Sequence, residues 1–217
     1  MEGEVGGMRL TIFGATGGTG RQLVEQALAA GHEVTAVVRD PARLAVPAQR
    51  RLRVVTADVM DPAAIQEAVA GADAVVSAVG PRTGGPTSVC RDSARSIVKA
   101  MQANGVRRLL LTSGSVVSDA GDGPVMRYLA KPLARRLLRH VLADFRHAEA
   151  EVHASDLDWT ILRPPRLTDR AARGRWRTAI DRNVPRGITL SRADLAAYLL
   201  TAVDDASTVH RHIFIAN

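Results

Sequence analysis

The segment Ile12-Phe13-Gly14-Ala15-Thr16-Gly17-Gly18-Thr19-Gly20 constrains the fold more than any other part of this chain. Its glycines have the spacing G-x-x-G-x-x-G, and the apolar run at residues 9–13 predicts a strand before it. The amphipathic stretch at residues 18–30 predicts a helix after it. A second apolar run at residues 33–38 then closes a β-α-β unit. In such a unit the helix begins with free backbone N–H groups that can bind phosphate.

The rest of the chain continues this alternation of strands and helices. Further strands are predicted at residues 53–56, 73–78, 106–112, 159–162 and 213–215. Further helices are predicted at residues 61–70, 88–104, 144–155 and 191–203. This order is typical of an α/β protein with a Rossmann-like, doubly wound parallel sheet covered by helices on both faces. We expect a flexible leader over residues 1–7, then a single domain over residues 8–217 with a small C-terminal section on the substrate side.

Each glycine of the turn has an expected role. Gly14 permits the tight turn, Gly17 lets the backbone approach a pyrophosphate, and Gly20 lets the helix pack closely on the strand. Hydroxyl groups in the turn add hydrogen-bond donors. The candidate phosphate-binding residues of this turn are Gly14, Thr16, Gly17, Gly18, Thr19 and Gly20. The alternative is a glycine-rich turn that binds no ligand.

The end of the second predicted strand bears on the choice of cofactor. Folds that bind NAD usually place an acidic side chain there, about 20 residues beyond the glycines, to bind the ribose 2′-hydroxyl. This chain has Arg39 there, 19 positions after Gly20, and Arg43 follows. A planar guanidinium suits a phosphate, so we expect NADP(H) in preference to NAD(H). In the alternative, the carboxylate of Asp40 turns inward to the ribose of NAD and Arg39 is an ordinary surface residue.

Four further segments resemble one family. They are Val37-Val38-Arg39-Asp40, Ala57-Asp58-Val59, Ser77-Ala78-Val79-Gly80-Pro81-Arg82 and Asp156-Leu157-Asp158-Trp159-Thr160-Ile161-Leu162-Arg163-Pro164-Pro165. With the glycine turn, they are similar to the atypical short-chain dehydrogenases/reductases. The nearest members are the biliverdin-IXβ and flavin reductases and the NmrA-like NAD(P)H-binding proteins. The resemblance covers nearly the whole chain from Met8.

The resemblance implies contacts between the cofactor and residues that follow the predicted strands. The implied contacts are Asp58 and Val59 at the adenine, Ala78, Val79, Gly80 and Arg82 along the nicotinamide half and the phosphates, and Thr112, Ser113, Pro164 and Pro165 beside the nicotinamide. Open α/β sheets bind ligands at these carboxyl ends of their strands. For Asp58 the alternative is that it caps the next helix.

The Tyr-x-x-x-Lys motif of most dehydrogenases in the wider family is absent. Tyr198 is followed four residues later by Ala202, and Tyr128 by Pro132, with Lys131 one position too early. The chain therefore lacks the usual tyrosine acid. This favours an easily reduced acceptor whose proton comes from water or from the acceptor itself.

Two residues are candidates for a role in catalysis. Ser113 follows the strand at residues 106–112, and its hydroxyl is expected to orient the nicotinamide carboxamide or the substrate; the alternative is a loop serine that caps backbone groups. Arg166 stands where the flavin and biliverdin reductases carry a histidine, and it is a candidate to bind an acidic substrate or a flavin phosphate. The departure from histidine puts a family-type role for this position in doubt.

Other titratable side chains are interpreted as structural. His140, His147 and His153 are expected on solvated helix surfaces, and Cys90 is expected to be a packed, inert thiol. No metal is expected, because the histidines, carboxylates and lone cysteine lack the spacing of zinc or calcium sites. The basic amphipathic stretch at residues 127–139 is expected to form a lid-side wall of the substrate pocket. Its alternatives are a solvated helix face and a contact with a membrane surface or nucleic acid.

Composition limits the partners and the location. The 29 basic and 22 acidic residues give a net charge of +7, and aromatic residues make up only 3% of the chain, which leaves little material for stacking bases. No apolar run approaches the roughly 18 residues of a membrane span. We therefore expect a cytoplasmic monomer or small homo-oligomer that binds a small-molecule acceptor and neither nucleic acid nor membrane.

Three functions remain open from the sequence. The first is an NADPH-dependent reductase that transfers hydride to a planar conjugated acceptor, such as a flavin, a quinone or a tetrapyrrole-like compound. The second is a protein that senses NADP(H) and regulates a partner without turnover. The third is a biosynthetic reductase or epimerase that acts on one metabolite.

Overall fold

A computed structural model, which describes residues 7–81 and 85–217, contains an eight-stranded sheet with the order β3-β2-β1-β4-β5-β6-β10-β8. Its strands are β1 (Arg9–Phe13), β2 (Glu33–Val38), β3 (Leu52–Thr56), β4 (Ala74–Ser77), β5 (Arg108–Thr112), β6 (Asp158–Arg163), β8 (Arg177–Ile180) and β10 (Arg211–Ala216). All neighbours pair in parallel except β8, which runs antiparallel to β10 at the edge. The predicted α/β fold with a doubly wound, mostly parallel sheet is confirmed.

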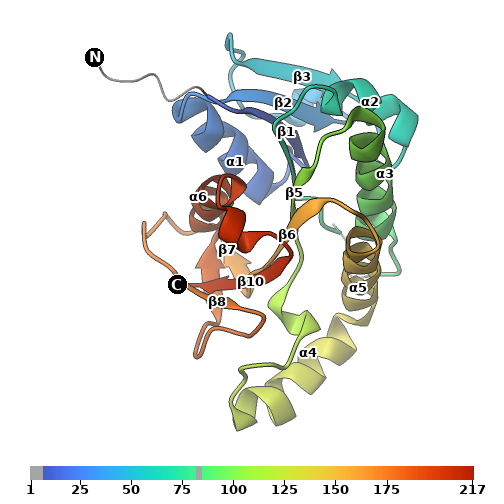
Figure 1. The fold of residues 1–217 in the computed structure, drawn as a ribbon. Helices are drawn as coiled ribbons and strands as arrows, with labels where there is room; N and C mark the ends of the chain where they lie inside the picture. Colours follow the sequence, from blue (N-terminus) through green and yellow to red (C-terminus); the bar gives the residue numbers. More distant parts are fainter. Residues whose placement is uncertain (1–6, 82–84) are drawn as a thin grey trace.

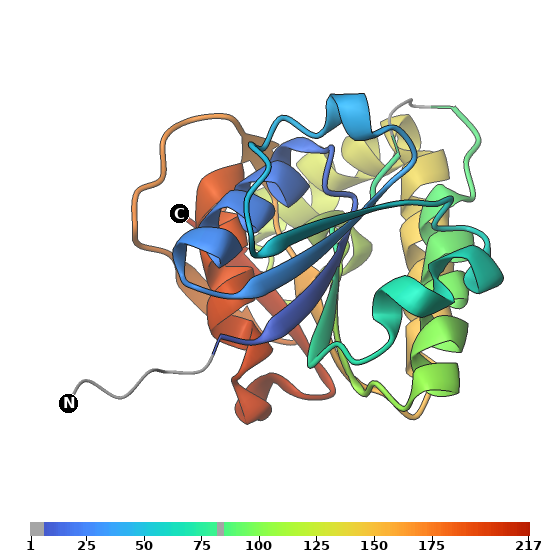
Figure 2. The same ribbon diagram turned by 90° about the horizontal axis from the view of Figure 1, so that it is seen from above.

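Helices cover both faces of the sheet, as Figures 1 and 2 show. On one face, α1 (Gly18–Ala29) packs beside α6 (Arg192–Val203). On the other face lie α2 (Pro62–Val69), α3 (Val89–Asn104) and α5 (Arg139–His153). These two layers leave the carboxyl ends of the central strands open between them.

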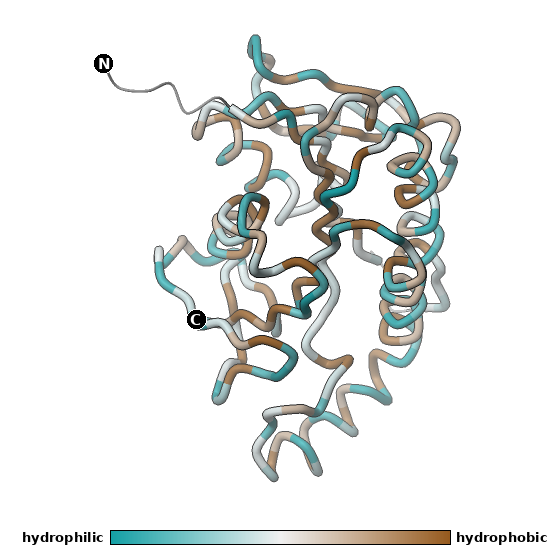
Figure 3. Tube along the Cα trace, viewed as in Figure 1, coloured by the Kyte–Doolittle hydropathy of each residue, from teal (hydrophilic) through white to brown (hydrophobic). Residues whose placement is uncertain are grey.

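Alternate side chains of each strand enter two separate cores. In β1, Ile12 packs beneath α1 and α6, and the next residue, Phe13, packs against α2 and α3. Both side chains are fully buried. Because both faces are covered, the central strands are mostly apolar, and Figure 3 shows hydrophobic positions running through the strands between the helix layers.

The start of α5 differs from the prediction. The sequence predicted a helix over residues 144–155, whereas the helix already begins at Arg139. The buried carboxylate of Asp144 caps α3: it accepts hydrogen bonds from the backbone N–H groups of Cys90 (3.0 Å) and Arg91 (2.9 Å). No local pattern indicated this role, because the capped helix lies more than 50 residues away in the sequence.

Several short elements were not predicted. The strands β7 (Arg166–Thr168) and β9 (Thr189–Ser191) form a separate parallel pair, and β8 extends the main sheet. A π-helical segment at Met126–Ala130 continues into α4 (Lys131–Leu137), which projects from the lower part of the molecule in Figure 1. Strands of three or four residues carry too little alternation to be recognised in a sequence.

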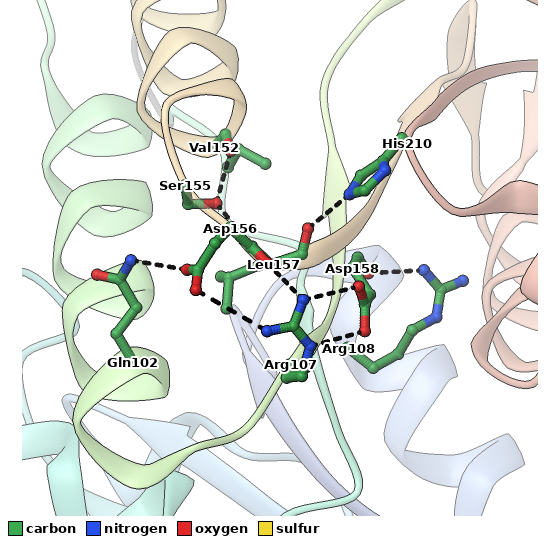
Figure 4. Close-up of polar contacts among 9 residues, drawn as sticks. All are labelled: Gln102, Arg107, Arg108, Val152, Ser155, Asp156, Leu157, Asp158 and His210. Atoms are coloured by element: carbon green, nitrogen blue, oxygen red, sulfur yellow. Dashed lines mark hydrogen bonds and ion pairs between the residues drawn. The ribbon is translucent and has the colours of Figure 1, made fainter.

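A polar network ties the amino ends of β5 and β6 together, at the opposite end of the sheet from the glycine turn (Figure 4). Arg107 pairs with Asp158 at 3.2 Å and with Asp156 at 3.8 Å. Arg108 turns toward α6 and donates to the carbonyl oxygens of Ala202 (2.5 Å) and Val203 (3.0 Å). The aspartates of the family-like segment therefore serve the fold and not the site.

Candidate cofactor and substrate site

The carboxyl ends of the parallel strands open into a cavity of about 1650 Å³, referred to below as the large cavity. Most of the residues predicted to form the site line it. They are Gly14, Thr16, Gly17, Gly18, Thr19, Arg39, Arg43, Asp58, Val59, Ala78, Val79, Gly80, Ser113, Pro164, Pro165 and Arg166. Two predicted residues, Gly20 and Thr112, lie outside its lining. Arg82 and residues 1–6 of the expected leader lie outside the described residues.

The glycines of the turn act through their shape. Gly14 has φ +78°, and a Cβ there would lie 2.6 Å from the Ala78 carbonyl oxygen. A Cβ on Gly20 would overlap the carbonyl of Gly14, so this glycine allows α1 to pack on β1 as predicted. Gly17 is exposed in the cavity, and a Cβ there would meet only the Gly14 oxygen, at 3.2 Å. A side chain at Gly17 would therefore enter the space that a phosphate needs.

The N-terminus of α1 is open to an anion. Its N-cap, Gly17, offers no side-chain acceptor, and the first turn of the helix holds no acidic residue. In α2, by contrast, Asp61 accepts from the N–H groups of Ala63 (3.0 Å) and Ala64 (3.4 Å). The uncapped N–H groups and the helix dipole make α1 the natural place for a phosphate at this edge of the sheet.

The end of β2 presents two arginines to the cavity. Arg39 and Arg43 are exposed, and neither forms an ion pair within the described part of the chain. Asp40 also lines the cavity, but its Oδ1 accepts a hydrogen bond from the N–H of Ala42 at 3.1 Å and caps the short turn Pro41–Arg43. The Asp40 carboxylate, whose inward turn was the alternative that would favour NAD, thus accepts a hydrogen bond from its own backbone turn.

Asp58 lies at the end of β3 and serves the local backbone. Its Oδ1 accepts from the N–H of Met60 at 3.1 Å, while Asp61 is the N-cap of α2. Asp61, and not Asp58, therefore caps the next helix. Asp58 and Val59 remain in the lining of the cavity, where the resemblance placed the adenine.

Ser113 carries a buried hydroxyl group in the cavity. The residue is 6% exposed, its N–H donates to the Leu162 carbonyl at 2.8 Å, and its Oγ has no hydrogen-bond partner among the described residues. Buried polar groups are nearly always paired, and leaving one unpaired costs about 1–3 kcal/mol. A ligand in the cavity would satisfy this hydroxyl.

Arg166 follows Pro164 and Pro165 and begins β7 at the edge of the cavity, where it is exposed. The carbonyl of Pro164 accepts from the N–H of Ser115 at 2.9 Å, which fixes this loop against the one after β5. Arg166 is therefore free to meet an acidic group of a bound molecule.

The wall formed by the π-helical segment and α4 is apolar on its inner side, as predicted for residues 127–139. Met126, Ala130, Ala134 and Leu138 line the cavity. Lys131 belongs to the stretch predicted to form this wall, but its burial and its ion pair were not predicted. It is buried, pairs with Asp122 at 2.5 Å and donates to the Ser115 and Ser118 carbonyls, which holds the wall against the loop after β5.

Arg192 is a second lining residue that sequence analysis missed. It is the first residue of α6, and its side chain lies against Gly18 of the glycine turn. The predicted helix at residues 191–203 located it in the chain, but no local pattern indicates that α6 packs beside α1.

The histidines and the cysteine lie apart from this chemistry. His153 and His212 approach through their Nε2 atoms at 3.0 Å and pack around Trp159, near the amino ends of β6 and β10. Burial lowers the pKa of both imidazoles. Cys90 is buried as predicted, and burial together with Asp144 raises the pKa of its thiol. Over the described ranges, no three metal-ligating side chains come together.

The lining fits a dinucleotide in chemistry as well as in size. The turn leaves room for a pyrophosphate beside the open N–H groups of α1. Arg39 and Arg43, which form no ion pair among the described residues, flank one end of the cavity, and the Ser113 hydroxyl, which has no hydrogen-bond partner among them, faces the other end. In the described part of the chain, no helix is long and apolar enough to cross a membrane.

Comparison with known proteins agrees with this geometry. A family model described as NAD(P)H-binding matches residues 14–206. An uncharacterized chloroplastic protein of Arabidopsis thaliana is 31% identical over 171 residues, which are 75% of this chain and 60% of that protein. A 3-diazoavenalumate denitrifying reductase from Streptomyces is 34% identical over 131 residues, 55% of this chain and 42% of that one. The chain thus spans less than two thirds of each of these relatives.

A solved structure shares the fold. ChuY, an anaerobilin reductase from Escherichia coli O157:H7, superimposes with a TM-score of 0.78 at 24% sequence identity, and the match covers 96% of both chains.

Proposed function

The chain belongs to the NAD(P)H-binding family, which confirms the resemblance found in its sequence, and from this premise we propose that it is an NADPH-dependent reductase. The acceptor we propose is a planar conjugated small molecule: a flavin, a quinone or a tetrapyrrole-like compound. Two of the proteins to which the chain is similar are themselves named reductases.

The observation that carries the proposal is the make-up of the large cavity. Its volume of about 1650 Å³ exceeds the roughly 300–1,000 Å³ of a typical ligand pocket. One part holds the glycine turn, and another is lined by apolar side chains such as Met126, Leu138 and Phe145. One space thus has room for a charged dinucleotide beside a flat apolar acceptor.

The chain's own residues bind and orient in this proposal. When bound, NADPH supplies the hydride. The open N-terminus of α1 holds its pyrophosphate and Arg39 its 2′-phosphate. The buried Oγ of Ser113 donates to the nicotinamide carboxamide or to the acceptor, and so fixes the two partners relative to each other. Arg166 attracts an acidic group of the acceptor at the edge of the cavity.

The nature of the acceptor follows from the absence of a phenol in the cavity lining. Of the two tyrosines, both within the described residues, Tyr128 is 71% exposed and Tyr198 packs against Trp176 with ring centroids 5.9 Å apart. Neither lines the cavity. Reduction of a simple ketone needs a positioned acid, whereas a conjugated acceptor can take its proton from water. The proposal therefore favours acceptors of the second kind.

The test is a panel assay of NADPH oxidation with FMN, a benzoquinone and biliverdin as acceptors, followed by the loss of absorbance of the reduced nicotinamide. Turnover with at least one acceptor is expected, and Gly17→Val should abolish it without lowering the melting temperature, because the new side chain fills the phosphate space. Tight NADP(H) binding without turnover on any acceptor would replace the reductase by a sensing role. Turnover that persists in Gly17→Val would place the site elsewhere.

A further inference from the structure

The first turn of α6 is held firmly beside α1. Ser191 Oγ accepts from the N–H of Asp194 at 3.0 Å, and the buried Asp194 carboxylate accepts from the N–H groups of Arg173 and Gly174, each at 3.0 Å. Gln26 of α1 donates to the Ala193 carbonyl at 3.1 Å. These bonds fix the backbone from which the Arg192 side chain departs.

The Arg192 side chain crosses the glycine turn. A Cβ placed on Gly18 would lie 2.6 Å from Arg192 Cδ and 2.9 Å from Nε. Arg192 also lines the large cavity together with Gly17 and Thr19. The arginine stem therefore lies over the open N-terminus of α1, where the proposed pyrophosphate would sit.

The guanidinium of Arg192 pairs with Asp169. Its Nη1 lies 2.7 Å from Asp169 Oδ1, and the two side chains are 30% and 86% exposed. An ion pair with so exposed a carboxylate is worth only about 0.2–1 kcal/mol. A pyrophosphate carries more charge and would sit beside a helix N-terminus, so it is the stronger partner for this guanidinium.

The position of Arg192 also opposes the stability of its own helix. A cation at the first residue of α6 meets the positive end of the helix dipole, which is unfavourable. A purely structural role for the charge would favour a neutral or acidic residue here.

We propose that Arg192 binds the pyrophosphate of the cofactor, and that Asp169 competes with the pyrophosphate for its guanidinium and so lowers cofactor affinity. This inference rests on the proposed cofactor site. The pyrophosphate is common to both dinucleotides, so Arg192 strengthens the binding of NADH and NADPH alike. It differs in this from Arg39, which acts on the 2′-phosphate of NADPH.

The experiment is calorimetric titration of NADPH and NADH into the wild-type chain, Arg192→Gln and the matched control Arg170→Gln. Arg170 is exposed and does not line the cavity, and its substitution removes the same charge. Loss of a charge-assisted hydrogen bond predicts about a tenfold weaker affinity for both cofactors in Arg192→Gln. The control should bind as the wild type does, and the melting temperature of Arg192→Gln should not fall.

A double-mutant cycle tests the competition. Asp169→Asn alone should tighten both cofactors by up to about fivefold, the worth of an exposed ion pair. In the Arg192→Gln background the same change should have no effect. An equal gain in both backgrounds would show that Asp169 acts as a plain negative charge, and would overturn the competition.

The outcomes separate this inference from the proposed function. If the wild type binds cofactor and Arg192→Gln binds it equally well, the role of Arg192 is refuted and the cofactor site stands. If Arg192→Gln weakens NADPH only, Arg192 contacts the 2′-phosphate and the pyrophosphate assignment is wrong. If the wild type binds neither cofactor, both proposals fall.

Discussion

The proposed preference for NADPH over NADH depends on Arg39 and can be tested directly. Arg39 is exposed at the end of β2 and forms no ion pair in the described part of the chain, so its guanidinium is available to a 2′-phosphate. A hydrogen bond to a charged group is worth about 1.5–3 kcal/mol. Because solvent screens an exposed arginine, the lower end applies, which corresponds to about a tenfold preference for NADPH.

The substitution Arg39→Ala should remove most of this preference and leave NADH binding nearly unchanged. Fluorescence titration of both reduced cofactors into the wild type, Arg39→Ala and Arg50→Ala measures the effect. Arg50 is exposed and outside the cavity lining, so its variant controls for the change in net charge. In the wild type, NADPH affinity should also fall faster than NADH affinity as ionic strength rises.

Equal affinities in the wild type, or a preference for NADH, would refute the reasoning. The structure gives a reason to expect otherwise, since Asp40 already accepts a hydrogen bond from the N–H of Ala42. For NAD to be preferred, this carboxylate would have to leave its cap and turn to the ribose. A stronger NADH affinity in Asp40→Asn than in the wild type would show that the carboxylate repels the cofactor rather than binds it.

Three further predictions concern stability and the buried polar groups. Ser113→Ala removes an unpaired buried hydroxyl, so thermal unfolding should show a melting temperature that is unchanged or higher, while NADPH oxidation falls; a lower melting temperature would mean that the hydroxyl is paired. Arg108→Leu leaves several backbone carbonyls without their donor and should cost about 3 kcal/mol in urea unfolding, whereas the exposed neighbour variant Arg107→Ala should unfold nearly as the wild type does. Burial lowers the pKa of His212, so the folded state favours the neutral imidazole. The stability that His212 contributes is present above the ordinary pKa of about 6.5 and is lost as pH falls through the lower folded value. When unfolding is compared at neutral and mildly acidic pH, the loss of stability should be smaller in His212→Gln than in the wild type.

The fold was predictable where the signals are local. The glycine turn, the strand before it and the strand at Glu33–Val38 lie where the sequence placed them, because period, turn residues and β-propensity agree there. The cap of α2 was equally plain, since Asp61 and Pro62 occupy the N-cap and first position of one short helix. Such features depend on residues within one turn of each other, and a single sequence records them completely.

The three missed side-chain roles depend on partners outside the helix that carries the residue. Asp144 caps a helix from across the structure, and Lys131 is buried only because Asp122 and two carbonyls of the preceding loop enclose it. Arg192 meets Gly18 because α6 packs beside α1. An arginine at a helix start and a lysine in an amphipathic run are ordinary surface patterns, so nothing in their neighbours distinguishes them.

The distribution of helix caps supports the glycine turn as the proposed anion site. Among the described residues, four α-helices at the edge of the large cavity come directly after a strand in the element order, and three of them have their first N–H groups satisfied by side chains: α2 by Asp61, α3 by Asp144 and α6 by Ser191. Of these four helices, α1, which begins after Gly17, is the one without a capping side chain or an acid in its first turn. A phosphate arriving at this edge would have to displace a cap at the other three helices, at a cost of about 0.5–2 kcal/mol each. At α1 it meets open donors directly, so the absence of a capping side chain directs the anion to the glycine turn.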